Sequence, residues 1–198
     1  MDSCMRRKQR GLQFYRKKKG LSMQAVKEVF SWIVLSVLAV FLAFMVIWAV
    51  GLRTNMIGVS MEPGLTNGQG ILVNRLKYRF FSPQTGDVVV FLPNGNQNAH
   101  YYVKRVVAVP GQTVLIQDGI LYIDGKAQEN EEMDLIASAG IAENEIKLGK
   151  DEYFVLGDNC NNSEDSRSAN VGPVLRSTIV GEAWFHFGNG TDGWGLIH

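Results

Sequence analysis

An uninterrupted apolar run at residues 29–52 constrains the fold of this chain more than any other feature. None of its 24 residues is charged, and most are Val, Leu, Ile, Ala, Phe, Trp or Met. A membrane-spanning helix needs about 20 such residues, whereas the apolar part of a cleavable secretory signal has only about 7–15. The run therefore predicts a retained transmembrane anchor rather than an ordinary soluble domain.

The charges on the two sides of this run predict its orientation. Residues 1–28 contain nine basic and two acidic residues, a net charge of +7, while the rest of the chain contains eleven basic and seventeen acidic residues, a net charge of −6. Positive flanks stay in the cytoplasm, so we expect a cytoplasmic amino terminus and an extracytoplasmic remainder. A basic tail beside an anchor favours anionic lipid headgroups over nucleic acid as its partner, and we expect no nucleic-acid binding.

Residues 53–198 are enough for one domain with its own core, and their pattern is mostly β. Short β-branched and aromatic runs, each bounded by Gly, Pro, Asn or Asp, predict strands at 70–74, 86–91, 101–109, 113–116, 120–123 and 152–156. No helical segments alternate with them, which argues against a parallel α/β sheet. The expected organisation is a basic cytoplasmic tail (1–28), a transmembrane anchor (29–52) and a compact extracytoplasmic β-rich domain (53–198).

The acidic composition of segment 129–150 predicts a solvent-exposed loop that could contain a short helix. Cys4 and Cys160 fall on opposite sides of the anchor, so they are not expected to form a disulfide with each other. No His/Cys cluster has the spacing of a zinc site, and we expect neither a metal nor a cofactor.

Two residues 44 positions apart suggest the chemistry. Ser60 follows the anchor closely, and Lys104 lies in the strand-like segment 101–107. A serine hydroxyl needs a neighbouring base to become a nucleophile, and a lysine supplies one only when burial lowers its pKa far below about 10.4. A charged lysine at a sheet edge, with no catalytic role, is the alternative. Of the three histidines, only His100, in the loop before Lys104, could serve in a serine–histidine triad.

The polar segment 156–167 supplies hydroxyls and carboxylates that could orient a lysine amine. It follows an apolar strand and contains Asp158, Ser163, Asp165 and Arg167. A calcium loop is the alternative, but the order of acidic residues does not match an EF-hand.

Taken together, these segments resemble the bacterial type I signal peptidases of the small, single-anchor kind. The resemblance covers the anchor and nearly all of the outer domain. It rests on four motifs in the family's order, which are Ser60-Met61-x-Pro63, Gly86-Asp87-Val88-Val89-Val90-Phe91, Tyr102-Val103-Lys104-Arg105 leading to Pro110-Gly111, and Gly157-Asp158-Asn159 with Ser163-x-Asp165-Ser166-Arg167.

The resemblance implies that Ser60 is the nucleophile and Lys104 the general base. It implies that Ser163 hydrogen-bonds the Lys104 amine and that Asp165 and Arg167 form a supporting ion pair. It also implies that Asp158 and Arg105 are further supporting groups. The residues expected to line the substrate pocket are Met61, Val103 and Tyr102.

The implied activity is removal of signal peptides from secretory precursors after a small-x-small site, with the substrate strand added to a sheet edge. The backbone N–H of Ser60 is the expected first oxyanion donor. Some family members place a serine two residues earlier as the second donor, but this chain has Gly58 there, so the second donor is open. Other departures from the family pattern are Gly64, Ala108 and Cys160.

Four apolar residues, Met56, Ile57, Phe80 and Phe81, could either form a surface that rests on the bilayer or belong to the core. Two other functions are also compatible with parts of the sequence. One is a non-catalytic, signal-peptidase-like assembly factor for surface polymers, although such proteins characteristically lack the serine or the lysine. The other is a cytoplasmic, self-cleaving Ser-Lys repressor.

Overall fold

A computed structural model describes residues 23–96, 99–128, 135–188 and 193–197. Most of the basic tail, with Cys4, lies outside the described residues. The chain divides into two units, residues 1–43 and 44–198.

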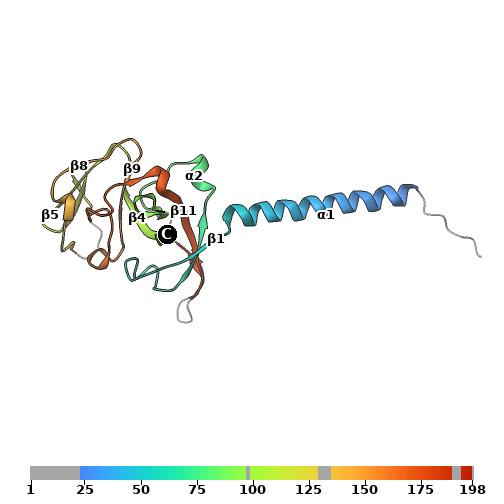
Figure 1. The fold of residues 1–198 in the computed structure, drawn as a ribbon, viewed down its shortest axis with the longest axis horizontal. Helices are drawn as coiled ribbons and strands as arrows, with labels where there is room; N and C mark the ends of the chain where they lie inside the picture. The colour runs from blue at the N-terminus through green and yellow to red at the C-terminus, as the bar shows by residue number, and fades with distance from the viewer. Residues whose placement is uncertain (1–22, 97–98, 129–134, 189–192, 198) are drawn as a thin grey trace, which may run out of the picture. The chain divides into compact units, whose positions relative to one another are not determined.

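The apolar run forms helix α1 (Met23–Val50), which begins six residues earlier than the predicted anchor (Figure 1). The helix ends before Gly51, and Leu52 already belongs to the first strand. By length and composition its segment Met23–Val46 could cross a membrane, and none of it is buried inside the protein. The helix is thus consistent with a membrane anchor.

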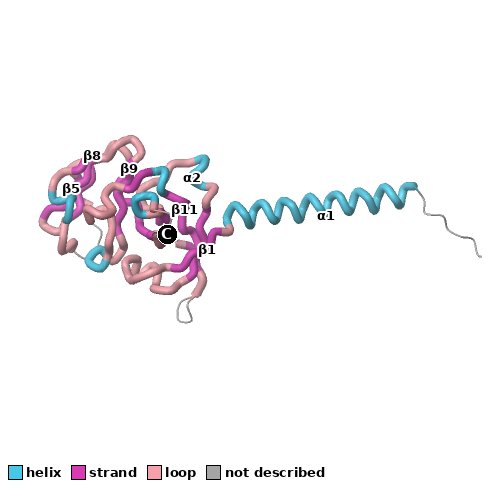
Figure 2. The backbone as a smooth tube through the Cα atoms, viewed as in Figure 1, coloured by secondary structure: helices cyan, strands magenta, loops and turns pink. Residues whose placement is uncertain are grey.

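The regular secondary structure of the domain that follows is mostly β-strand, as predicted, and loops connect the strands (Figure 2). The larger sheet contains β1 (Leu52–Asn55), β2 (Gly70–Asn74), β3 (Val88–Phe91), β4 (Tyr102–Ala108), β9 (Glu152–Leu156), β10 (Val174–Leu175), β11 (Ile179–His186) and β12 (Gly195–Leu196). The smaller sheet contains β5 (Thr113–Gln117), β6 (Ile120–Ile123), β7 (Lys126–Ala127) and β8 (Ile146–Lys147). The helical elements are α2 (Lys77–Phe80), η1 (Pro93–Gly95), η2 (Gly140–Glu143), η3 (Cys160–Asn162) and η4 (Arg176–Thr178).

Neighbouring strands of the described residues are antiparallel throughout. The larger sheet has the order β1-β2-β11-β3-β4-β9-β10, with β12 paired to β11, and the smaller has the order β7-β6-β5-β8. All six predicted strands are present, so the mostly β fold class is confirmed. The shorter strands, among them β7, β8, β10 and β12, carried too few residues for a visible alternation.

The larger sheet has apolar cores on both faces, and β3 shows why. Successive side chains of a strand point to opposite faces. Val88 and Val90 therefore join one core with Met61, while Val89 and Phe91 join the other. This strand is buried on both sides, and its continuous apolar sequence follows from that position.

The sequence predicts that segment 129–150 is a solvent-exposed loop, but part of it is buried. Residues 129–134 lie outside the described residues, but the rest contributes Ile136, Ala142 and Leu148 to a core beneath the smaller sheet. Its short helix is the 3-10 turn η2. The apolar residues are widely spaced, and only the packing of β5 and β9 onto them reveals that they are buried.

Candidate active site

Ser60 lies in a turn-rich connection between β1 and β2, in the first turn after Gly58. Gly58 has a φ of +87°, a backbone conformation that favours glycine. The side chain of Ser60 is 7% exposed. The connection therefore turns the serine inward, with its backbone held by a bond from the Asn159 N–H to the Ser60 carbonyl (3.0 Å).

Lys104 reaches this serine from β4. Its register with β3 places it opposite Val89, so β4 presents it on the same face as Tyr102, which pairs with Phe91. Lys104 Nζ donates a hydrogen bond to Ser60 Oγ at 2.5 Å, and the lysine is only 5% exposed. The two residues singled out by the sequence are thus in direct contact in the folded chain.

Burial lowers the pKa of Lys104 from its ordinary 10.5 to about 8. Loss of hydration is the main cause, because a buried ammonium loses the water that stabilises its charge. The carboxylates of Asp165 and Glu164 oppose this effect, and the Arg167 guanidinium adds to it. At pH 7 about one Lys104 side chain in ten is therefore neutral, against roughly one in three thousand for an exposed lysine.

Asp165 and Arg167 form a buried, two-pronged ion pair. Arg167 donates to the two carboxylate oxygens of Asp165 at 2.8 and 2.9 Å, and the residues are 7% and 1% exposed, respectively. Arg167 also donates to the carbonyls of Ser138 and Cys160, and Asp165 accepts from the Gly157 N–H. The pair ties the loop after β9 to its surroundings and partly neutralises the carboxylate that lies near Lys104.

A second, less buried pair joins β4 to the same loop. Arg105 donates to both carboxylate oxygens of Asp158, at 2.8 and 2.7 Å, and to the carbonyl of Gly86 at 3.0 Å. Since Arg105 adjoins the lysine in sequence, this pair fixes the β4 backbone next to Lys104.

The expected hydrogen bond from Ser163 to the Lys104 amine is not formed. The Ser163 hydroxyl is buried, and it has no hydrogen-bond partner among the described residues. It lies instead against Gly157, where an added Cβ would collide with both Ser163 Oγ and the Ser60 carbonyl oxygen. Close packing of three chain segments, rather than a polar contact, sets the position of this hydroxyl.

Gly157 is a residue whose role the sequence reasoning missed. Because glycine has no Cβ, the loop after β9 can approach the Ser60 carbonyl oxygen this closely. A glycine directly after a buried strand, and before a polar loop, is the signal that could have identified it.

A pocket of about 350 Å³ opens next to the serine–lysine pair. It is lined by Met56, Ile57, Gly58, Val59, Ser60, His100, Tyr101, Tyr102, Val103, Lys104, Asn162 and Glu164. Of the three residues expected to line the substrate pocket, Tyr102 and Val103 line this cavity. Met61 does not, because the turn after Ser60 directs it into the core, where it is 0% exposed. His100 reaches the pocket, but the hydrogen bond to Ser60 Oγ comes from Lys104.

The hydrogen bonds of the backbone around Ser60 bear on the expected oxyanion donors. Within the described part of the chain, the Ser60 N–H donates no hydrogen bond. The Gly58 N–H instead donates to Asn67 Oδ1 at 2.9 Å, and Gly58 has no hydroxyl to offer. The Gly58 N–H is therefore already hydrogen-bonded within the fold.

The three departures from the family pattern have local explanations. A Cβ at Gly64 would lie 3.5 Å from Asp158 Oδ2, so a hydroxyl side chain there could reach this carboxylate, and glycine cannot. Ala108 is fully buried in the core under the smaller sheet. Burial raises the pKa of the Cys160 thiol, which donates to the Gly157 carbonyl. Among the described residues, none of the three forms a hydrogen bond with Ser60 or Lys104.

The four apolar residues expected at the bilayer or in the core are divided between core and surface. Met56 is 2% exposed and belongs to the core, whereas Ile57, Phe80 and Phe81 are 59%, 78% and 68% exposed. Among the described residues no group of three or more His, Cys, Asp or Glu side chains could hold a metal ion.

Comparisons with known proteins agree on one family. Residues 29–187 match the family described as signal peptidase, peptidase S26. The chain is 32% identical to signal peptidase IB of Staphylococcus aureus over 183 residues, which is 81% of this chain and 90% of that protein. It is 35% identical to the probable signal peptidase I-1 of Synechocystis over 134 residues, 65% of this chain and 66% of that protein. A crystal structure of a signal peptidase I from Enterococcus faecalis aligns with a TM-score of 0.43 and 26% identity, over 52% of this chain and 97% of that one.

Proposed function

Because the chain belongs to the signal peptidase family, peptidase S26, we propose that this serine peptidase removes amino-terminal signal peptides from exported precursors, with Ser60 as nucleophile and Lys104 as general base. The observation that carries the proposal is the 2.5 Å contact between Ser60 Oγ and a buried Lys104 Nζ whose pKa is lowered to about 8. A lysine with an ordinary pKa would be protonated at neutral pH and could not accept the hydroxyl proton.

The reaction follows from this contact. When Nζ is neutral, the Ser60 hydroxyl donates its proton to the amine while Oγ attacks the scissile carbonyl carbon. The backbone N–H of Ser60 donates to the oxyanion that develops. Lys104 then returns the proton to the leaving amine nitrogen, so that the mature protein departs and the signal peptide remains as an ester on Ser60.

Hydrolysis of the ester uses the same base. A water molecule gives a proton to Lys104 as its oxygen attacks the ester carbonyl, and the proton then passes to Ser60 Oγ as the ester bond breaks. The signal peptide leaves with a new carboxylate, and the enzyme regains its starting state.

The lining of the pocket supports a preference for small side chains before the cut. Apolar atoms from Met56, Ile57, Val59 and Val103 lie beside Ser60. Because Met56 and Val103 also belong to a closely packed core, a large substrate side chain would have to displace packed atoms. Small residues at the first and third positions before the cut, the small-x-small pattern, avoid that displacement.

The proposed location is the cell membrane, with a cytoplasmic amino terminus and an extracytoplasmic catalytic domain. Helix α1 is long and apolar enough for a span, and the excess of basic residues lies before it. Protease added to intact spheroplasts should degrade the catalytic domain, and its protection there would contradict this orientation.

Cleavage of a secretory precursor by the purified full chain tests the activity. Wild-type protein should release a mature protein whose new amino terminus follows a small residue, whereas Ser60→Ala and Lys104→Met should not. Wild-type cleavage that is no faster than that of either variant would remove the serine–lysine mechanism. A cut after a large residue would contradict the proposed pocket.

A further inference from the structure

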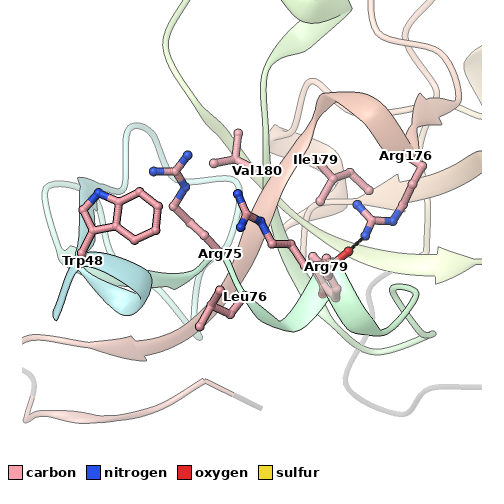
Figure 3. A pocket seen from close by; sticks show the side chains of 8 residues that line it. Trp48, Arg75, Leu76, Arg79, Arg176, Ile179 and Val180 are labelled. Atoms are coloured by element: carbon pink, nitrogen blue, oxygen red, sulfur yellow. Dashed lines mark hydrogen bonds between the residues drawn. The ribbon is translucent and has the colours of Figure 1, made fainter. Parts of the chain in front are cut away.

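A second pocket, away from the serine–lysine pair, gathers three arginines. This arginine pocket has a volume of about 260 Å³, and the residues that line it include Trp48, Arg75, Leu76, Arg79, Arg176 and Val180 (Figure 3). In that view the guanidinium groups of Arg75 and Arg79 lie between the indole of Trp48 and the guanidinium of Arg176. None of the described residues that line it is acidic.

The charges of two of these arginines are not neutralised. Among the described residues, neither Arg75 nor Arg79 has a carboxylate within 4.0 Å, and both side chains are exposed. Lys77, between them in sequence, is different, because it is paired with Asp87 at 3.0 Å and Glu182 at 2.6 Å. Of the three cations at residues 75–79, only Lys77 is neutralised by ion pairs within the described part of the fold, and the charges of the two arginines could interact with a ligand.

The third arginine is held in place. Arg176 donates to the backbone carbonyls of Tyr78 and Phe81, and its guanidinium carbon lies 5.4 Å from the centre of the Tyr78 ring. Neutral carbonyls accept its hydrogen bonds without cancelling its charge. The chain from residue 29 onward carries a net charge of −6, so three arginines around one cavity are a local exception to its composition.

The neighbours of the pocket indicate where it lies. Trp48 follows the apolar segment Met23–Val46 by two residues and is 60% exposed. Tryptophan is enriched at the level of lipid headgroups, where its ring is apolar and its N–H can contact water. Phe80 and Phe81, directly after Arg79, are 78% and 68% exposed. Apolar side chains that would enter a bilayer thus adjoin cations that would meet its headgroups.

From this combination we propose that the arginine pocket binds the phosphate of an anionic phospholipid headgroup, with Arg75 and Arg79 as its principal cationic contacts. Guanidinium groups offer paired N–H donors that match phosphate oxygens. Trp48, Leu76 and Val180 supply apolar surface for the glycerol end of the lipid. A lipid held there would fix the catalytic domain at the membrane surface, where the proposed precursor substrates are anchored.

The inference rests on the proposed membrane location but not on the peptidase chemistry. The test is native mass spectrometry of the full chain in detergent, with phosphatidylglycerol and phosphatidylcholine of identical acyl chains in competition. Wild-type protein should retain phosphatidylglycerol preferentially. A basic residue near anionic lipid strengthens binding by about fivefold, so the double variant Arg75→Gln/Arg79→Gln should bind phosphatidylglycerol about 25-fold more weakly. Binding of phosphatidylcholine, whose choline cation offsets the charge of its phosphate, should weaken less, so that the preference is lost.

The matched control is Lys126→Gln/Lys147→Gln, which removes the same charge from exposed positions of the smaller sheet. Arg176 is left intact because its hydrogen bonds hold backbone. An unchanged melting temperature of each double variant verifies its fold, and Ser60→Ala should lose cleavage yet keep the lipid preference.

Equal loss of the preference in the control, or none in the double variant, would overturn the proposal. Displacement of phosphatidylglycerol by an equal concentration of inorganic phosphate would also overturn it, because the pocket would then be a site for free anions.

Discussion

The proposed mechanism predicts a specific dependence of activity on pH, because only neutral Lys104 can accept the serine proton. Lowering its pKa from 10.5 to about 8 corresponds to a net destabilisation of the charged form by about 3 kcal/mol, with desolvation as the main cause. The lysine is 5% exposed, so solvent screens little of this effect. The value of kcat/KM for a precursor peptide should therefore rise with pH and reach half its maximum near pH 8.

The assay is kcat/KM measured across neutral and alkaline pH with the full chain in detergent, since this parameter reports the ionisation of the free enzyme. Activity at pH 7 should be about one tenth of the alkaline plateau. A midpoint near about 6.5 would indicate an ordinary histidine base, and one above about 10 a solvated lysine. Either result would refute the link between burial and catalysis.

The lowered pKa of Lys104 should also make the free energy of unfolding depend on pH. Its pKa is lower in the folded chain than in the unfolded chain, so between about pH 8 and 10.5 the unfolded chain binds the extra proton. The contribution of Lys104 to the free energy of unfolding therefore rises with pH in this window and is smallest below pH 8.

Lys104→Met, which has no such charge, should be more stable than wild type at pH 7, and the difference should shrink by about 3 kcal/mol as the pH approaches 10.5. Urea unfolding of both proteins across this range measures the difference. Parallel stability curves would mean that Lys104 is not desolvated in the folded chain.

Three further substitutions test the surroundings of the pair. Asp165→Asn leaves Arg167 buried without its partner and should reduce the free energy of unfolding, measured by urea titration, by about 3–5 kcal/mol. A loss of only about 0–1 kcal/mol, typical of an exposed ion pair, would show that the pair is not buried in solution. Gly157→Ala forces a Cβ against the carbonyl oxygen of Ser60. We expect kcat to fall at least tenfold and the free energy of unfolding to fall by about 1–3 kcal/mol. An unchanged kcat would mean that the loop after β9 can move away freely. Glu164→Gln removes a carboxylate that raises the pKa of Lys104, so the midpoint of the pH profile should move to lower pH, and a shift to higher pH would contradict the electrostatic assignment.

Much of the fold could be predicted from local patterns. The apolar run predicted helix α1 because its length exceeds what a globular core needs, and the β-branched runs predicted strands because each is short and bounded by turn residues. The segment 135–148 could not be predicted in the same way. Its buried residues Ile136, Ala142 and Leu148 are too far apart to form a periodic pattern, and they become core only when the smaller sheet covers them.

Ser60 and Lys104 could be identified as candidates from the sequence, because Ser60 follows the predicted anchor closely and Lys104 is a potential base within a predicted strand. The positions of their neighbours were not. Met61 adjoins Ser60 in sequence yet points into the core, and the Ser163 hydroxyl faces Gly157 instead of the Lys104 amine. Side-chain direction at a turn depends on backbone angles and on packing, which motif spacing does not specify.

The sequence by itself determined the membrane-type helix, the β-rich domain after it, and the order of the motifs, because each depends on residues close together in the chain. Only the tertiary structure decided that Lys104 is desolvated against Ser60 and that Arg176 joins Arg75 and Arg79 around one cavity. Desolvation and electrostatic proximity depend on distance in space. Strand register and loop packing bring those groups together from distant positions in the chain.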